Sequence, residues 1–370
     1  MQYKISQEQE LLKQTIGELA QSEIFPLSAK IDWEARVPDS LLQILPSYGL
    51  YGVTIPQEFG GAGADFLGLV VSIEELCKAS ASLGAQIAFH NAVVAEAMIA
   101  STNKDLRGVF LPKLASGILG AFFIDARSPV SCKSESDYFI LNGTCEYVMS
   151  AVSAGIFLIL TKMADGSRAL VCFSKQDGDG LRIGPAKKLL GMRASQTASI
   201  HFHDLKIPRD SILFEPSRTD SSLQQITAKA RLIVAAQALG IGQASLDAAI
   251  KYSNERSQFK TTIGSFYAVR DFIAQDEISL QSARSITYSV ADEISLFQTP
   301  MRDSAIAKIA ASDAAVSASR HSIRIHGGYG FIRDYQVERY LRDARATQIY
   351  IESNEALKGD IAGSLLGKNA

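Results

Sequence analysis

The stretch from Ala228 to Gln258 is the feature that most constrains the fold of this 370-residue chain. Its apolar residues recur at helical spacing with almost no interruption, over a length that exceeds an ordinary globular helix. A second such pattern covers Ala268 to Leu296 and ends before Pro300, and a third covers Arg302 to about Ile325. Long antiparallel helices bury one face in a bundle, and a second apolar face favours contacts between subunits.

The pattern changes between about residues 119 and 214, where short β-type runs replace helical periodicity. Asn142-Gly143, Asp165-Gly166 and the cluster from Asp177 to Gly180 have the composition of turns between strands. The runs are Tyr138–Leu141, Ile156–Leu160, Ala169–Phe173, Leu181–Ile183 and Ser199–Ile207. We therefore predict a small β domain in the middle of the chain.

The first part of the chain again has helical periodicity. Ser6 can cap a helix that continues through Leu19, and the runs Ser72–Leu83 and Ala85–Ala100 are typical of buried helices. Glu74 and Glu75 fall near the surface by this periodicity. The predicted architecture is mainly α with a central β domain: an N-terminal helical domain (1–118), a middle β domain (119–214) and a C-terminal helical-bundle domain (215–370).

Composition narrows the classes of partner. A net charge of −2 offers no attraction to nucleic acid or to an anionic membrane. The longest continuous apolar stretch lies around Ala154–Leu160 and is too short to cross a bilayer. We therefore expect no contact with a membrane. The four cysteines lack CxxC spacing, which favours a reduced, cytoplasmic setting. His201 and His203 alternate on one strand without a third ligand, so we expect no metal.

Several motifs, in order along nearly the whole chain, resemble those of the acyl-CoA dehydrogenase family. They are Ile55–Gly61, Leu111–Gly117, Leu190–Ser195, Leu205–Pro208, Ala235–Ile241, Glu255–Phe259, His326–Gly330, Val337–Asp343 and Gln348–Glu355. The resemblance implies an α–β–α three-domain fold with a C-terminal four-helix bundle. It also implies FAD as cofactor and a tetrameric assembly.

The resemblance assigns candidate residues to the cofactor and the substrate. Part of the flavin site comes from the neighbouring subunit in this family, and the matching positions persist here. The expected cofactor-binding residues are Arg256, Gln258, Phe259, Arg324, Gly327, Gly328, Ser353 and Glu355, and the expected substrate-binding residues are Arg193, Ser195 and Arg231. The residues that line the flavin ring from the same subunit are changed: Asp125–Ser128 replaces a Gly-Ser-Asp loop, and Met149 replaces a hydroxyl residue.

The base that removes the substrate α-proton is the main departure from the family. Many members carry Tyr-Glu-Gly-Thr-Asn-Glu near the C-terminus, and the first Glu is the base. Here that position is Ile351, which accepts no proton, and a Glu follows at Glu352. Some relatives place the base on the long helix, where this chain has Ala230. Glu352 is the first candidate base, although one residue of helical backbone rotates a side chain by about 100°; Asp125 is the other.

Three functions remain open from the sequence. The first is an FAD enzyme that oxidises an acyl thioester on CoA or on an acyl carrier protein and passes electrons to an electron-transfer flavoprotein or to oxygen. The second is a non-catalytic subunit that completes the FAD site of a paralogue in a mixed tetramer. The third is a flavin reaction on a carrier-bound intermediate that needs no α-carboxylate.

Overall fold

The N-terminal part of the chain is helical. The structure, a computed structural model, describes residues 4–176, 179–214, 216–294 and 300–367. Ser6 caps the first helix with a reciprocal capping box to Gln9, as the sequence predicts. The helices are α1 (Gln7–Leu19), α2 (Ser28–Glu34), α3 (Asp39–Ile44), α4 (Phe66–Ala79), α5 (Ala81–Phe89), α6 (Glu96–Ala100) and α7 (Lys104–Ala115), with a π-helical segment at His90–Ala95 between α5 and α6.

The middle of the chain forms one seven-stranded sheet in the order β1-β4-β2-β3-β7-β6, with β5 paired to β4. All five predicted strands are present, whereas β1 and β2 were not predicted because their four-residue runs are too short for a clear period. The strands are β1 (Gly120–Phe123), β2 (Ser131–Ser134), β3 (Tyr138–Val148), β4 (Ile156–Met163), β5 (Arg168–Ser174), β6 (Leu181–Ile183) and β7 (Ala198–Pro208).

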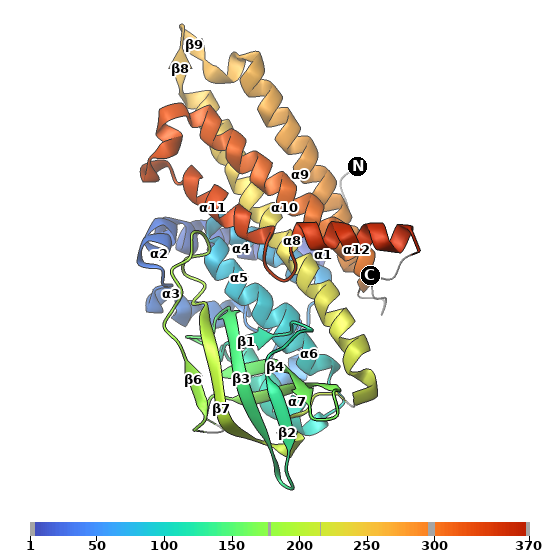
Figure 1. Ribbon diagram of the computed structural model, residues 1–370. Coiled ribbons are helices and arrows are strands. Elements are labelled where there is room, and N and C mark those ends of the chain that lie inside the picture. The colour runs from blue at the N-terminus through green and yellow to red at the C-terminus, as the bar shows by residue number, and fades with distance from the viewer. Residues whose placement is uncertain (1–3, 177–178, 215, 295–299, 368–370) are drawn as a thin grey trace.

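Long helices follow the sheet and form the C-terminal bundle (Figure 1). The predicted helices are confirmed, but the first begins at Pro216 rather than Ala228 and ends before Gln258, which lies in a small hairpin. The predicted end of the second, Leu296, lies outside the described residues. The elements are α8 (Pro216–Glu255), β8 (Ser257–Gln258), β9 (Thr261–Thr262), α9 (Tyr267–Ile294), α10 (Met301–His326), α11 (Val337–Thr347) and α12 (Asn354–Leu365).

Two large hydrophobic cores hold these layers together, and a small third cluster surrounds Ala249, Ile263 and Ile325. One continuous cluster joins the N-terminal helices to α8, α9 and α10, and the other lies within the sheet. The yellow α8 runs from the β domain through the centre of the molecule to the tip of the bundle (Figure 1). The predicted α–β–α architecture is therefore confirmed, and α8 is the helix that connects the β domain to the tip of the bundle.

Three local predictions were wrong. The helix break falls at Ser80, where φ is −149°, rather than between Leu83 and Ala85. Asn142-Gly143 makes no turn: Gly143 has a φ of 137° and lies at a bulge inside β3. Glu74 and Glu75 are buried rather than near the surface. The Glu74 carboxylate accepts hydrogen bonds from Arg284 Nε (2.8 Å) and the Tyr288 hydroxyl (2.9 Å) on α9, and Glu75 accepts from Lys78 Nζ (2.7 Å).

Two helical stretches, Ala81–Ala100 and Ser217–Glu255, are long and apolar enough to span a bilayer by length and composition alone. Small and polar residues interrupt both, so neither is a continuous apolar run in the sequence. Within the protein, 83% and 78% of their apolar windows are buried. Such burial is typical of core helices, so this finding is weak support for a membrane span.

Two buried titratable groups have opposing effects on the pH dependence of stability. Burial lowers the pKa of His90 to about 4. The stability that the neutral imidazole contributes to the fold is therefore fully present above pH 6.5 and is lost as pH falls through 4. Burial raises the pKa of Asp343 to about 6. The stability that the protonated carboxyl contributes to the fold is therefore fully present below pH 3.8 and is lost as pH rises through 6. The two effects offset each other between pH 4 and pH 6.

We expect Asp343→Asn to reveal the pH dependence of stability that His90 alone causes. The amide keeps an acceptor for the Met192 N–H (2.6 Å in the native chain) but does not titrate. The free energy of unfolding of this variant should fall by about 3 kcal/mol between pH 6.5 and pH 4, while that of the native chain changes less. Urea titrations across this range measure the difference. His90→Gln is the matched control and should reverse the slope; an identical pH profile for all three proteins would contradict the assignment.

Candidate active site and flavin-binding pocket

The segment that follows α11 contains position 351, where the family resemblance predicts the base. Its backbone is closed by a hydrogen bond from Asn354 N to Gln348 O (3.0 Å), and Ser353 caps α12 by accepting from Ala356 N (3.2 Å). Ile351 has a φ of 67°, the left-handed region that a β-branched residue rarely adopts. Glu352, at the position where many relatives have Gly, does not have a positive φ. The backbone strain of this segment therefore lies at the residue that replaced the expected base.

Glu352 is held by a residue on α8. Its carboxylate accepts a hydrogen bond from Arg231 Nε at 2.6 Å, and Arg231 also donates to the backbone oxygen of Met301 at 2.7 Å. Arg231 is buried, whereas about a third of the Glu352 side chain is exposed. A charge-assisted hydrogen bond of this kind contributes roughly 1.5–3 kcal/mol. Glu352 must break that bond before it can act as a base, and its catalytic role stays a prediction.

A buried lysine lies beneath the same segment. The Lys308 ammonium on α10 donates to the backbone oxygen of Glu352 (2.6 Å) and to Asn354 Oδ1 (3.2 Å). Its side chain is fully buried, and burial lowers its pKa to about 8 even though the Glu352 carboxylate raises it. Lys308 was not among the residues predicted from the sequence. The available signal was a single cation in the middle of an Ala- and Ser-rich helix.

Aromatic and polar side chains pack around Tyr350, the residue before Ile351. The Tyr350 ring meets Phe89 edge-on at 5.7 Å between centroids, and Phe89 contacts Phe122 at 5.2 Å. The Tyr350 hydroxyl donates to Gln237 Oε1, and the buried Nε2 of Gln237 has no hydrogen-bond partner. Burial raises the pKa of Tyr350 well above its usual range, so its hydroxyl stays neutral. This side of the segment is therefore uncharged, with one unpaired amide donor.

A second group of predicted residues converges at the far end of the bundle. Arg256, Gln258, Gly327 and Gly328 line one pocket of about 480 Å³, together with Tyr252 and Tyr329. Gly327 has a φ of 59°, and a Cβ at either glycine would meet no atom within 4 Å, so backbone is open to a ligand there. The Arg256 guanidinium lies 5.9 Å from the Tyr329 ring centroid. Four of the eight predicted cofactor-binding residues are thus neighbours in space.

The other predicted cofactor residues lie elsewhere. Phe259 is 89% exposed at the turn between β8 and β9, and the Arg324 guanidinium packs over the Phe272 ring at 4.4 Å. Ser353 and Glu355 belong to the start of α12, next to Lys308. At about 1.5 Å of rise per residue, the 18 residues from Lys308 to His326 on α10 separate the two groups by roughly 27 Å.

The remaining candidates have local partners. Arg193 donates to the backbone oxygen of Trp33 (3.5 Å), and the buried Ser195 shares a hydrogen bond with Thr197 (2.9 Å), which favours a structural role for this turn. Asp125 accepts from Arg127. His201 contacts Thr144 and Ser199. Within the described residues there is no cluster of three metal-ligating side chains.

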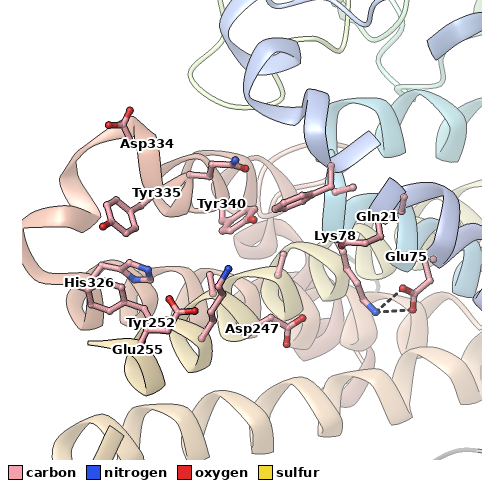
Figure 2. Close-up of a pocket in the computed structure, with 18 residues that line it drawn as sticks. Gln21, Glu75, Lys78, Asp247, Tyr252, Glu255, His326, Asp334, Tyr335 and Tyr340 are labelled. Carbon is pink, nitrogen blue, oxygen red and sulfur yellow. Dashed lines mark hydrogen bonds and ion pairs between the residues drawn. The ribbon is translucent and has the colours of Figure 1, made fainter. Parts of the chain in front are cut away.

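A cavity of about 510 Å³ adjoins the flavin-pocket candidates but does not include Ile351, Glu352 or Arg231 (Figure 2). It lies between α1, α4, α8 and the segment from Asp334 to Tyr340. It shares Tyr252 and His326 with the smaller pocket, and the rings of these two residues stack at 4.2 Å. This cavity therefore contains none of the three residues predicted to lie at the reaction site.

Comparisons with known proteins agree with this geometry. Family models described as the N-terminal and C-terminal domains of acyl-CoA dehydrogenase match residues 6–118 and 221–366. The human protein named short-chain specific acyl-CoA dehydrogenase, mitochondrial, is 31% identical over 369 residues, which cover 96% of this chain and 90% of that protein.

This chain belongs to the acyl-CoA dehydrogenase family. Butyryl-CoA dehydrogenase from Megasphaera elsdenii has the same fold, with a TM-score of 0.94, 26% identity and coverage of 99% of this chain and 100% of that chain. A chain from a structure of the electron transferring flavoprotein of Acidaminococcus fermentans matches equally well, with a TM-score of 0.94, 27% identity and the same coverage. Acyl-CoA dehydrogenases are FAD-dependent enzymes that oxidise acyl thioesters. The chain therefore has the fold of this family, while Ile351, Asp125–Ser128 and Met149 are the positions at which the sequence departs from the expected motifs.

Proposed function

We propose that this chain is an FAD-dependent oxidoreductase that dehydrogenates an acyl thioester, carried on CoA or on an acyl carrier protein. The pocket around Arg256, Gln258, Gly327 and Gly328 carries this proposal. Arg256 would hold a phosphate oxygen of FAD by charge-assisted hydrogen bonds, and the two glycines leave room for the diphosphate beside the backbone. When bound, FAD accepts the β-hydride of the substrate.

The distance between the two groups of predicted site residues supports an assembly of several chains. The pocket with Arg256 and the segment with Ile351 lie roughly 27 Å apart along α10, by the helical rise from Lys308 to His326. A flavin ring beside Ile351 would therefore receive its phosphate contacts from the pocket of a neighbouring subunit. We propose a tetramer, either of this chain alone or with a paralogue, in a cytoplasmic setting.

Glu352 is the proposed base. The α-proton of a thioester is weakly acidic, so the acceptor must be a free carboxylate close to the α-carbon. Glu352 would have to turn from Arg231 toward the substrate, and Arg231 would then remain next to the thioester with a free donor. Electrons would leave to an electron-transfer flavoprotein or to oxygen.

The function is tested by the absorbance of the purified protein and by its response to butyryl-CoA. We expect a yellow oligomer with about one FAD per chain, whose absorbance bleaches when butyryl-CoA is added without oxygen. Glu352→Gln should abolish bleaching, whereas Glu10→Gln, which changes an exposed glutamate of α1 outside the predicted site, should not. Bleaching that survives in Glu352→Gln would remove Glu352 as the base. A flavin-loaded protein that no acyl thioester reduces would remove the proposed function.

A second function is favoured by the ion pair between Glu352 and Arg231 and by Ile351 itself. The pocket that would serve a neighbouring flavin is intact, while the carboxylate next to its own reaction site is engaged. The chain would then be the non-catalytic subunit of a mixed tetramer. A colourless protein that acquires FAD only when a paralogue is co-expressed supports this function, and a yellow homo-oligomer excludes it.

Arg256→Ala should weaken FAD binding. Loss of a charge-assisted hydrogen bond costs roughly 1.5–3 kcal/mol, so we expect the dissociation constant of FAD to rise about 10- to 100-fold. Quenching of flavin fluorescence during titration of the apoprotein measures it. Arg270→Ala removes an exposed arginine of α9 outside the pocket and serves as the control. Equal affinities for the two variants would exclude Arg256 as a flavin ligand.

A further inference from the structure

The cavity drawn in Figure 2 has three aromatic rings at one end. Its volume of about 510 Å³ is typical of small-molecule sites in proteins. The Tyr252 ring stacks on the His326 ring with centroids 4.2 Å apart. The Tyr335 ring meets both of them edge-on, at 5.8 Å from Tyr252 and 5.6 Å from His326. These rings come from α8, the end of α10 and the segment before α11, so the tertiary fold builds an aromatic corner in the cavity wall.

Acidic side chains outnumber basic side chains around this cavity. Its lining contains four carboxylates and two ammonium groups, which leaves a net charge of −2. They belong to Glu75, Asp247, Glu255 and Asp334, and to Lys78 and Lys251. Lys78 pairs with Glu75 at 2.7 Å, so the charges of these two residues cancel. Lys251 lies one helical turn from both Asp247 and Glu255 on α8 and can balance only one of them. The rim of the cavity therefore keeps an excess of negative charge.

The polar atoms near the aromatic end are mainly hydrogen-bond acceptors. His326 Nδ1 donates to the backbone oxygen of Ser322 (2.7 Å), so Nε2 keeps a lone pair that can accept. Burial lowers the pKa of His326, which keeps its ring neutral at pH 7. The Asp247 carboxylate accepts from Gln243 Nε2 (2.9 Å) and keeps its charge. Figure 2 shows Glu255 and Asp247 between the aromatic end and the Glu75–Lys78 pair. A ligand that complements these groups carries positive charge.

The combination of rings and carboxylates favours an organic cation over a metal ion. The face of a tyrosine ring is the negative end of its quadrupole and attracts an ammonium group, and methylated ammonium groups are the ligands that clustered aromatic rings recognise. A hard metal ion requires several oxygen ligands at close range instead. We propose that this cavity binds an organic cation, with a methylated ammonium group against Tyr252 and Tyr335 and the carboxylates of Asp247 and Glu255 beside it. The site is additional to the acyl-thioester site and does not depend on it.

The test is a calorimetric titration of the FAD-loaded protein with choline. The control ligand is the neutral alcohol in which a tert-butyl group replaces the trimethylammonium group, because it has the shape of choline without its charge. We expect choline to bind about 3- to 30-fold more tightly than this alcohol, the range that cation–π contacts contribute.

Three substitutions locate the site. Tyr335→Leu should remove most of the preference for choline, and the FAD content should not change because Tyr335 lines this cavity but not the smaller pocket. Tyr335→Phe keeps the ring face and should keep the preference. Tyr48→Leu changes a tyrosine that is 41% exposed and lines neither cavity, so it is the matched control.

A carboxylate variant gives a second measurement if Tyr335→Leu does not fold. Asp247→Asn should weaken choline binding and leave the affinity for the neutral alcohol unchanged, because only the charge of an exposed side chain is removed.

Three results would overturn the proposal. Equal affinities for choline and the neutral alcohol would show that positive charge is not recognised. A preference that survives in both Tyr335→Leu and Asp247→Asn would place the choline site elsewhere. Binding of choline that disappears when FAD is added would assign the cavity to the flavin site. None of these results depends on whether an acyl thioester reduces the flavin, so the proposed function is tested separately.

Discussion

Replacing Ile351 with Glu should raise the rate of flavin reduction by butyryl-CoA about 10²- to 10⁴-fold, the range that a positioned acid or base contributes. The variant places a carboxylate where many relatives of this family carry their base. It also removes a β-branched side chain from a backbone with a φ of 67°, so the backbone strain should decrease rather than increase. Stopped-flow absorbance of the FAD-loaded protein measures the rate.

Ile351→Gln is the control for the first prediction, because it has the same size as Glu but accepts no proton at neutral pH. We expect its rate to match that of the native chain. If Ile351→Glu is no faster than Ile351→Gln, the side chain at position 351 does not face the substrate. If the native chain already equals Ile351→Glu, the base is another group, and loss of activity in Glu352→Gln would identify it.

Lys308→Glu should lower the free energy of unfolding by about 3–5 kcal/mol, the usual cost of leaving a buried charge without its partner. The new carboxylate would face the backbone oxygen of Glu352 and Asn354 Oδ1, two acceptors that offer it no proton. The segment that carries Ile351 would lose the contact that holds it against α10. Chemical denaturation at pH 7 measures the loss.

Lys308→Met is the matched control for the second prediction. It removes the ammonium without adding a negative charge, and it relieves the desolvation that lowers the pKa of Lys308 to about 8. We expect a cost of about 1–3 kcal/mol from the two unpaired oxygens, which is smaller than the cost of Lys308→Glu. Equal losses in the two variants would show that the ammonium contacts add little and that packing volume dominates.

Two side chains hold the segment that contains Ile351 and Glu352. The Lys308 ammonium donates to the backbone oxygen of Glu352, and Arg231 on α8 donates to the Glu352 carboxylate. Both contacts favour the present conformation, in which the available carboxylate is engaged. A substrate that draws Glu352 away from Arg231 must supply at least the free energy of that charge-assisted hydrogen bond, roughly 1.5–3 kcal/mol.

Most elements could be predicted from the sequence because their signals are local. The long apolar periods of α8, α9 and α10, the alternation in β3 and β7 and the continuous apolar runs of β4 and β5 depend only on neighbouring residues. Boundaries were less accurate where one residue overrides the pattern, as Ser80 does between α4 and α5. Gly143 was mistaken for a turn residue because a bulge and a turn require the same backbone freedom.

The sequence by itself determined the order of helical and β segments, the family, and the absence of a carboxylate at position 351. The tertiary structure decided which charges meet. Glu352 and Arg231 are 121 residues apart, and Glu74 and Arg284 are 210 apart, so no local pattern predicts either pair. Burial is also set by packing, which is why Glu74 lies inside although the periodicity of its own helix places it near the surface. A charge can stay buried only where distant segments bring its partner, and that depends on the whole fold.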